Sequence, residues 1–142
     1  YELGLKQELL GGRLRYSLVG YAMHWKNQKA QAQVVLTADS PRTVTFRVPG
    51  DSEIRGAEFE ADWAATERLR VGATLNWTDS TYADFDLAAN AQVFGGTVLD
   101  GYDAAGNVQP RFPEWSGTLS ATWADRLGEA WGWYVRGDLP YT

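Results

Sequence analysis

Three acidic side chains at alternate positions are the residues best placed for chemistry in this sequence. Glu58, Glu60 and Asp62 are each two residues apart, and successive side chains of a β-strand point to opposite sides, so the three carboxylates share one face of a strand. A pair of carboxylates can divide the roles of general acid and general base, but nothing around these three singles out such a pair. Burying several like charges without partners would be very costly. The face is therefore predicted to be wet or paired with cations.

Arginine side chains are the expected partners of these carboxylates. Arg13, Arg15 and Arg70 fall on segments predicted to be neighbouring strands, from which they could pair with the carboxylates across the sheet. In a soluble protein such a charged face would be the solvent-exposed side of a sheet. In a wide barrel it would line a water-filled lumen.

The sequence offers no constellation for catalysis. His24 is the only histidine and the chain has no cysteine, which argues against a histidine-based metal site, a Ser-His-Asp triad, thiolate chemistry and a disulfide framework. The glycine pair Gly95-Gly96 lacks a phosphate-binding context. We therefore predict that the protein is not an enzyme and has no catalytic residue, metal site or cofactor.

Composition leaves two classes of β-protein open. The 142 residues are 44% hydrophobic and 13% aromatic, with 15 glycines, which fits both a membrane barrel and a soluble β-sandwich. No run approaches the roughly 20 consecutive apolar residues of a membrane-spanning helix. The net charge of -5 and the lack of a basic patch argue against nucleic-acid binding.

Two-residue alternation of apolar and polar side chains predicts the elements. It is clearest over residues 69–78 and 115–123, where one face holds Leu, Val, Ala and Trp and the other holds mainly hydroxyls and amides. Further strands are predicted at residues 1–6, 13–22, 43–48, 54–63 and 131–138. Strand character also resumes at 34–36 after a polar run at 26–29. Residues 49–51 are expected to form a bulge or kink, and residues 39–41 a turn.

Connection lengths and tryptophan positions favour the membrane barrel. Short turns are predicted at residues 11–12, 66–68 and 125–128, whereas longer connections lie around residue 39 and across residues 79–111, with a small hairpin or helical turn at 87–94. Short turns at one end and long loops at the other are typical of outer-membrane barrels. Trp63 and Trp123 end strands just before short turns, and Trp131 and Trp133 begin one just after, as expected of aromatic residues at a membrane interface. These features place Leu75 towards lipid and predict the following lumen-facing residues: Glu58, Glu60, Asp62, Arg70 and Asn76.

Four segments resemble the C-terminal barrel region of TonB-dependent outer-membrane receptors. Residues 1–6 with the glycine turn and Arg13-Leu14 resemble that family's recurrent strand-turn-strand. Residues 50–60 resemble its strand with a glycine followed by alternating glutamates, and residues 69–82 the next strand and its exit into a loop. Residues 106–116 resemble the re-entry segment, in which a proline precedes the next strand.

The resemblance implies an all-β fold, an antiparallel meander of about 6–8 strands belonging to a larger transmembrane barrel of about 22 strands. Residues 1–142 would be a partial barrel domain, with the plug domain, signal peptide and terminal strands outside it. The implied activity is TonB-coupled import of a siderophore-iron complex, a cobalamin or a glycan across the outer membrane of a Gram-negative bacterium. The implied partners are the lipid bilayer, the TonB system through the plug, and a small nutrient. Open strand edges could also drive self-association. The loop residues that could contact the nutrient are Phe85, Phe94 and Tyr102.

Two other interpretations remain at this point. A soluble β-sandwich or barrel could bind a ligand such as a glycan through exposed aromatic residues. A small adhesin-like membrane barrel would need a short complete chain that ends in an aromatic strand.

Overall fold

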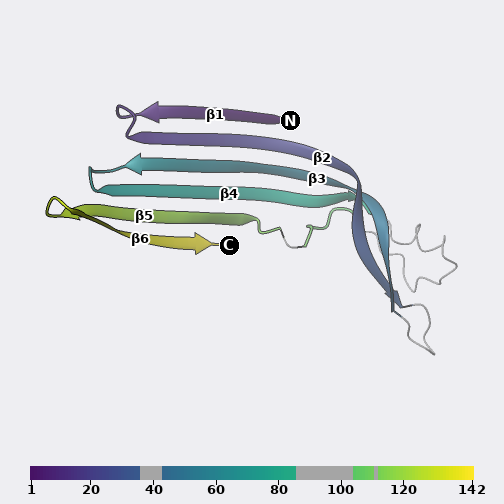
Figure 1. Ribbon diagram of the computed structural model, residues 1–142. Coiled ribbons are helices and arrows are strands. Elements are labelled where there is room, and N and C mark those ends of the chain that lie inside the picture. The colour runs from purple at the N-terminus through teal and green to yellow at the C-terminus, as the bar shows by residue number, and fades with distance from the viewer. Residues whose placement is uncertain (36–42, 86–103, 111) are drawn as a thin grey trace. The chain divides into compact units, whose positions relative to one another are not determined.

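The protein is a single antiparallel meander over the residues that its structure describes. The computed structural model describes residues 1–35, 43–85, 104–110 and 112–142, and side chains outside 30–48. Six strands follow one another in chain order in one sheet (Figure 1), which confirms the predicted fold class. Their bounds are β1 Glu2–Leu9, β2 Leu14–Val35, β3 Thr43–Ala64, β4 Leu69–Asp84, β5 Trp115–Leu127 and β6 Trp131–Tyr141. Within the described ranges, no helix is long and apolar enough to span a membrane.

The chain divides into two compact units. Unit 1 consists of Tyr1–Ala22, Arg55–Thr78 and Phe112–Thr142, and unit 2 consists of Met23–Ile54 and Asp79–Arg111. The long strands β2, β3 and β4 contribute residues to both. Each unit therefore has its own packing and is described separately.

The short turns of unit 1 follow from their glycines and hydroxyls. Gly11 and Gly12 adopt φ values of 66° and 87°, a conformation open to glycine at low cost, and they close the β1–β2 turn. In the β3–β4 turn the hydroxyl of Thr66 accepts hydrogen bonds from the amides of Arg68 at 3.1 Å and Leu69 at 2.9 Å. This local bonding satisfies backbone groups that leave the ladder.

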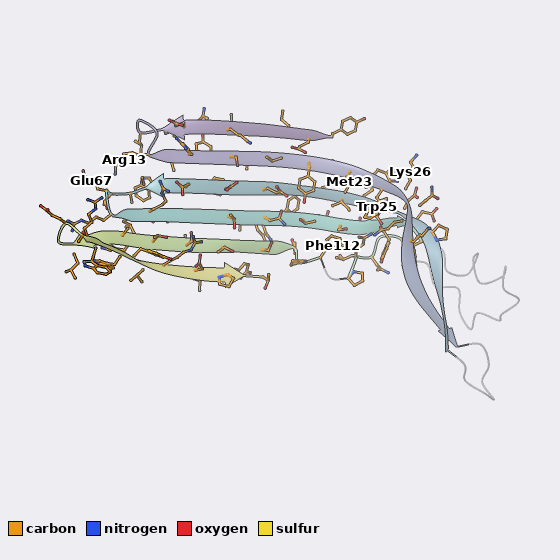
Figure 2. The ribbon with its side chains drawn as sticks, viewed as in Figure 1. Arg13, Met23, Trp25, Lys26, Glu67 and Phe112 are labelled. Carbon is orange, nitrogen blue, oxygen red and sulfur yellow. The ribbon has the colours of Figure 1, made fainter. Side chains whose placement is uncertain are left out.

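Arg13 connects these two turns. Its Nε donates to the carbonyl of Ala64 at 3.0 Å, and its Nη2 donates to the carbonyl of Ala65. Figure 2 shows Arg13 and Glu67 at the same end of the sheet. The guanidinium thus holds the β1–β2 turn against the end of β3.

The structure differs from the sequence prediction at three places where a strand was expected to be interrupted or to end. β2 continues through the polar run at 26–29, where Asn27 takes a φ of 55° and donates its amide to Asp51 Oδ1 at 2.9 Å. β3 is unbroken across Pro49 and Asp51, so the irregular residue lies on β2 and not at the predicted bulge. β5 runs to Leu127, because its last residues pair with the start of β6, and the turn is shifted to residues 128–130.

The predicted loop at residues 79–111 begins later than expected. β4 extends to Asp84, and residues near its end also bond to a distant segment: Gln109 donates its amide to the Ser80 carbonyl at 2.9 Å, and Tyr82 donates to the Asn107 carbonyl at 3.0 Å. Such pairing leaves no periodic signal in β4 itself. The predicted turn at 39–41 and the hairpin or helical turn at 87–94 lie outside the described residues.

Unit 1 leaves its large apolar side chains uncovered. The buried apolar residues in the described part of the chain are Ile54, Phe85 and Ala104, and all three belong to unit 2. In a β-sandwich, by contrast, inward-facing side chains are buried between two sheets. The exposed apolar residues of unit 1 include Leu3, Leu5, Leu18, Phe59, Trp63, Leu75, Trp115, Leu119, Trp123, Trp131, Leu139 and Tyr141. A contiguous apolar surface of this size marks a membrane or partner contact.

Gly56 is the most crowded of the glycines described in unit 1. The Tyr21 side chain crosses over it from β2, and the Tyr21 hydroxyl lies 3.1 Å from Thr78 Oγ1 on β4. A Cβ at position 56 would collide with the Tyr21 ring and come within 2.6 Å of the Trp77 carbonyl oxygen. The absence of a side chain at Gly56 allows one tyrosine to connect three strands.

Replacing Gly56 by alanine should therefore destabilise the sheet. We expect G56A to lower the free energy of unfolding by about 1–3 kcal/mol through overpacking, measured by denaturant unfolding of the full-length protein. Gly20→Ala is the matched control, because a Cβ there meets no atom within 4 Å. Equal losses in the two variants would contradict the crossing of Tyr21 over Gly56.

Candidate functional site

Alternate positions of β3, β4 and β5 form a polar face on unit 1. The register of β4 and β5 places Arg70 opposite Thr122, Thr74 opposite Thr118, and Asn76 opposite Ser116. The ion pair between Asp62 and Arg70 brings the alternate positions of β3 to the same face. The polar face consists of Glu58, Glu60, Asp62, Arg70, Thr74, Asn76, Ser116, Thr118, Ser120 and Thr122.

The remaining positions of these strands and of β6 form an apolar face. The register pairs Leu69 with Trp123, Trp77 with Trp115, and Leu119 with Leu139. The apolar face consists of Phe59, Trp63, Leu69, Val71, Leu75, Trp77, Trp115, Leu119, Trp123, Leu139 and Tyr141. These side chains continue the uncovered surface described above.

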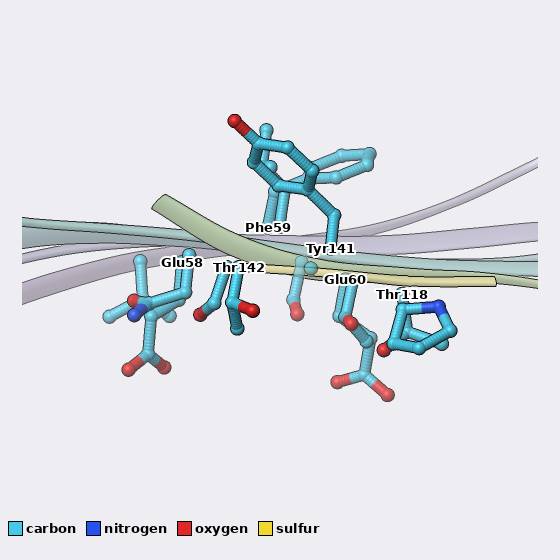
Figure 3. A pocket seen from close by; sticks show the side chains of 14 residues that line it. Glu58, Phe59, Glu60, Thr118, Tyr141 and Thr142 are labelled. Atoms are coloured by element: carbon cyan, nitrogen blue, oxygen red, sulfur yellow. The ribbon is translucent and has the colours of Figure 1, made fainter. Parts of the chain in front are cut away.

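Figure 3 views this sheet along its edge and separates the two faces. The rings of Phe59 and Tyr141 stand on one side, and the side chains of Glu58, Glu60 and Thr118 stand on the other. Because side chains of both faces border this region, it is a two-sided stretch of sheet. Such a sheet can expose polar side chains to water on one side and apolar side chains to a hydrocarbon environment on the other.

One of the three predicted arginine partners pairs with a predicted carboxylate. Arg70 Nε lies 3.6 Å from Asp62 Oδ1, with both side chains more than half exposed. Arg15 instead pairs with Glu8 at 3.1 Å, because Glu8 lies directly opposite it on β1. The prediction that Arg13 pairs with a carboxylate is wrong, since its guanidinium satisfies the two backbone carbonyls of the β3–β4 turn.

The other residues predicted to lie on the polar face differ in whether they have ion-pair or hydrogen-bond partners. Over the described part of the chain, Glu58 and Glu60 are exposed and make no ion pair. Asn76 donates from Nδ2 to Thr78 Oγ1 at 3.1 Å, whereas its Oδ1 is buried without a hydrogen-bond partner there. A buried acceptor of this kind calls for a donor from water or from another molecule.

Tryptophan side chains lie at both ends of the apolar face, in two levels. Trp63 and Trp123 lie near the short turns, and Trp77 and Trp115 pair at the other end with ring centroids 6.4 Å apart. Positions 115 and 123 are eight residues apart in β5, or about 26 Å along an extended strand. In an outer-membrane barrel the strands are tilted by about 35–45°, so this spacing corresponds to about 20 Å along the membrane normal, which fits within the apolar band of about 25 Å between two aromatic girdles. Sequence reasoning used only the first level, although the two-residue alternation in residues 69–78 and 115–123 already placed Trp77 and Trp115 on the apolar face.

Of the three loop residues predicted to contact a nutrient, Phe85 is the one that the structure describes. Phe85 is 7% exposed, and its ring stacks on Tyr82 with centroids 5.0 Å apart. Phe94 and Tyr102 lie outside the described residues. Contact of these three residues with a nutrient stays a prediction.

Sequence reasoning also missed a buried polar cluster in unit 2. It joins Gln28, Ser52, Ser80 and Gln109, which come from four separate segments. Serine and glutamine at such distances in the sequence give no recognisable motif. Elsewhere in the described ranges, no group of three or more His, Cys, Asp or Glu side chains is arranged to hold a metal ion.

Comparison with known proteins covers the whole chain. The family model described as TonB dependent receptor-like, beta-barrel, matches residues 1–142. No curated protein matches the chain, and no solved structure matches it.

The ion pair on the polar face should contribute little to stability. In a double-mutant cycle with Asp62→Asn and Arg70→Gln, we expect a coupling free energy below about 1 kcal/mol, because exposed pairs are screened by water. Unfolding titrations of the full-length single and double variants at low salt and at 1 M salt measure it. A coupling of several kcal/mol, or one that salt does not weaken, would show that this face is dry.

Proposed function

Because the chain belongs to the family of TonB-dependent receptor-like β-barrels, we propose that it forms part of an outer-membrane transporter that imports a scarce nutrient with energy from the TonB system. The family is one of transporters and not of enzymes, and its barrels typically lie in the outer membrane. The nutrient class proposed here is a siderophore-iron complex, a cobalamin or a glycan.

The observation that carries this proposal is the uncovered apolar face of unit 1. Its side chains are exposed on one side of a sheet whose other side holds carboxylates, hydroxyls and amides. In a transmembrane barrel the apolar positions face lipid and the alternate positions face a polar interior. The proposed lumen residues are therefore Glu58, Glu60, Asp62, Arg70 and Asn76.

The size of the sheet supports a partial barrel domain. Within the described residues, β1 and β6 each pair with one neighbouring strand, and a lipid-exposed sheet edge with unpaired amides and carbonyls is not tolerated in a bilayer. We infer that further strands of the same receptor complete the barrel, and that a plug domain in the lumen connects it to TonB. The buried, unpaired Asn76 Oδ1 is a proposed acceptor for water or for a group on that plug.

Arginine substitutions at adjacent positions test which face meets lipid. Leu75→Arg places the charge on the apolar face two residues from the Trp77–Trp115 level, between the interface and the bilayer midplane, and should cost about 1–3 kcal/mol of stability. Thr74→Arg places the same side chain on the polar face and should cost much less. Urea titration of the full-length barrel in lipid vesicles measures both; a larger cost at Thr74 would reverse the assignment of faces.

Uptake by whole cells tests the transport activity. The complete gene is expressed in a Gram-negative host, and radiolabelled ferric siderophores, cobalamin and oligosaccharides are supplied with and without TonB. We expect the protein in the outer-membrane fraction and uptake of one nutrient class only when TonB is present. Uptake that persists without TonB, or a protein found only in the soluble fraction, contradicts the proposal.

A further inference from the structure

The buried polar cluster of unit 2 joins a returning segment to three strands. Gln109 Nε2 donates to Gln28 Oε1 at 2.7 Å and to Ser52 Oγ, and Gln109 Oε1 accepts from Ser80 Oγ at 3.0 Å. Ser52 Oγ in turn donates to Gln28 Oε1. Ser52 and Ser80 are at most 1% exposed and Gln109 is 3% exposed. One carboxamide therefore bonds to side chains of β2, β3 and β4.

Residues 104–109, called the strap below, also pair with β4 through the backbone. Gly106 donates its amide to the Tyr82 carbonyl at 2.7 Å, Tyr82 donates to Asn107, and Gln109 donates to Ser80. Thr81 and Val108 form an isolated antiparallel bridge. The strap is thus a short segment beside β4, to which these backbone bonds tie it.

The strap has little apolar anchoring. Ala104 is 4% exposed beside the 7% exposed Phe85, but Val108 is 67% exposed. Segments with few buried apolar contacts and solvent-accessible backbone bonds open at lower free energy than the fold as a whole. The polar groups that Gln109 and its partners Gln28, Ser52 and Ser80 bring together are hydroxyls and carboxamides, and water can form hydrogen bonds with them after the strap opens. Polar burial therefore fixes the closed position without preventing local opening.

We propose that residues 104–109 open and close on the sheet as one local unit, and that the Gln109 side chain is the positioning group that holds them closed. Ala104 donates its amide to the Phe85 carbonyl at 3.0 Å, so opening also releases this contact. The device follows from the geometry of unit 2 alone and does not depend on the transport proposed above.

Hydrogen exchange of the folded full-length protein tests the strap. In Gln109→Ala the amides of Tyr82, Ala104, Gly106 and residue 109, which form the backbone bonds between the strap and residues 80–85, should exchange faster by roughly tenfold or more, because the partners of the lost carboxamide become unsatisfied. The amides of Thr78 and Ala124, which bond to Glu114 and Arg68 in unit 1, should keep their rates.

Val108→Ala is the matched control. It changes the neighbouring residue, whose side chain is exposed, and should leave all these rates within about twofold, since a valine side chain forms no hydrogen bond. Unchanged exchange in Gln109→Ala would overturn the proposal, because backbone pairing alone would then hold the strap. A uniform rise across both units would overturn it as well, since Gln109 would then support the whole fold.

A reversible cross-link provides a second measurement. Thr81 and Val108 lie opposite each other in the bridge, at a spacing compatible with a disulfide, and the chain has no native cysteine. In the variant T81C/V108C/Q109A, oxidation should restore slow exchange to the strap amides, and reduction should return it to the fast rate. Fast exchange that persists in the oxidised variant would overturn the opening motion.

Discussion

The structure depends on the register in which neighbouring strands pair. A shift of one residue moves every side chain to the opposite face, and the pairing of Leu69 with Trp123 through to Trp77 with Trp115 keeps nine consecutive pairs in step. A slip of β5 against β4 would place its hydroxyls beside the leucines and tryptophans of β4. The separation of a polar from an apolar face is therefore a property of pairing, and no single residue supplies it.

The faces of β4 and β5 could be predicted from the sequence, because apolar and polar side chains alternate there with a period of two residues. The end of β4 was not readable, since Ser80 and Tyr82 are held by residues more than 20 positions away. The position of Asn27 was equally hidden: its positive φ is stabilised by Asp51 on another strand. Local patterns predict local geometry, and these departures come from partners that only the fold brings together.

Charged and neutral polar groups have different roles in the two units. The pair Asp62–Arg70 of unit 1 is exposed, so water competes with it and its charges mainly determine what the face can contact. Gln109 and Ser52 in unit 2 are uncharged and buried, so their hydrogen bonds have no competing water and fix the position of a segment. Charge could be counted from the sequence, whereas the buried amide could not be located without its three neighbouring strands.

The length of β2 and β3 affects where irregular backbone conformations are tolerated. Each strand has 22 residues, whereas about 9–11 are enough to cross a bilayer. In the proposed barrel, hydrocarbon requires every amide and carbonyl of the membrane-spanning residues to be bonded within the protein, whereas residues beyond the bilayer are free of this requirement. Pro49, which has no amide hydrogen, and the twisted Asn27 both fall within unit 2. Insertions should accordingly accumulate in unit 2 during evolution, while the strands of unit 1 keep their lengths.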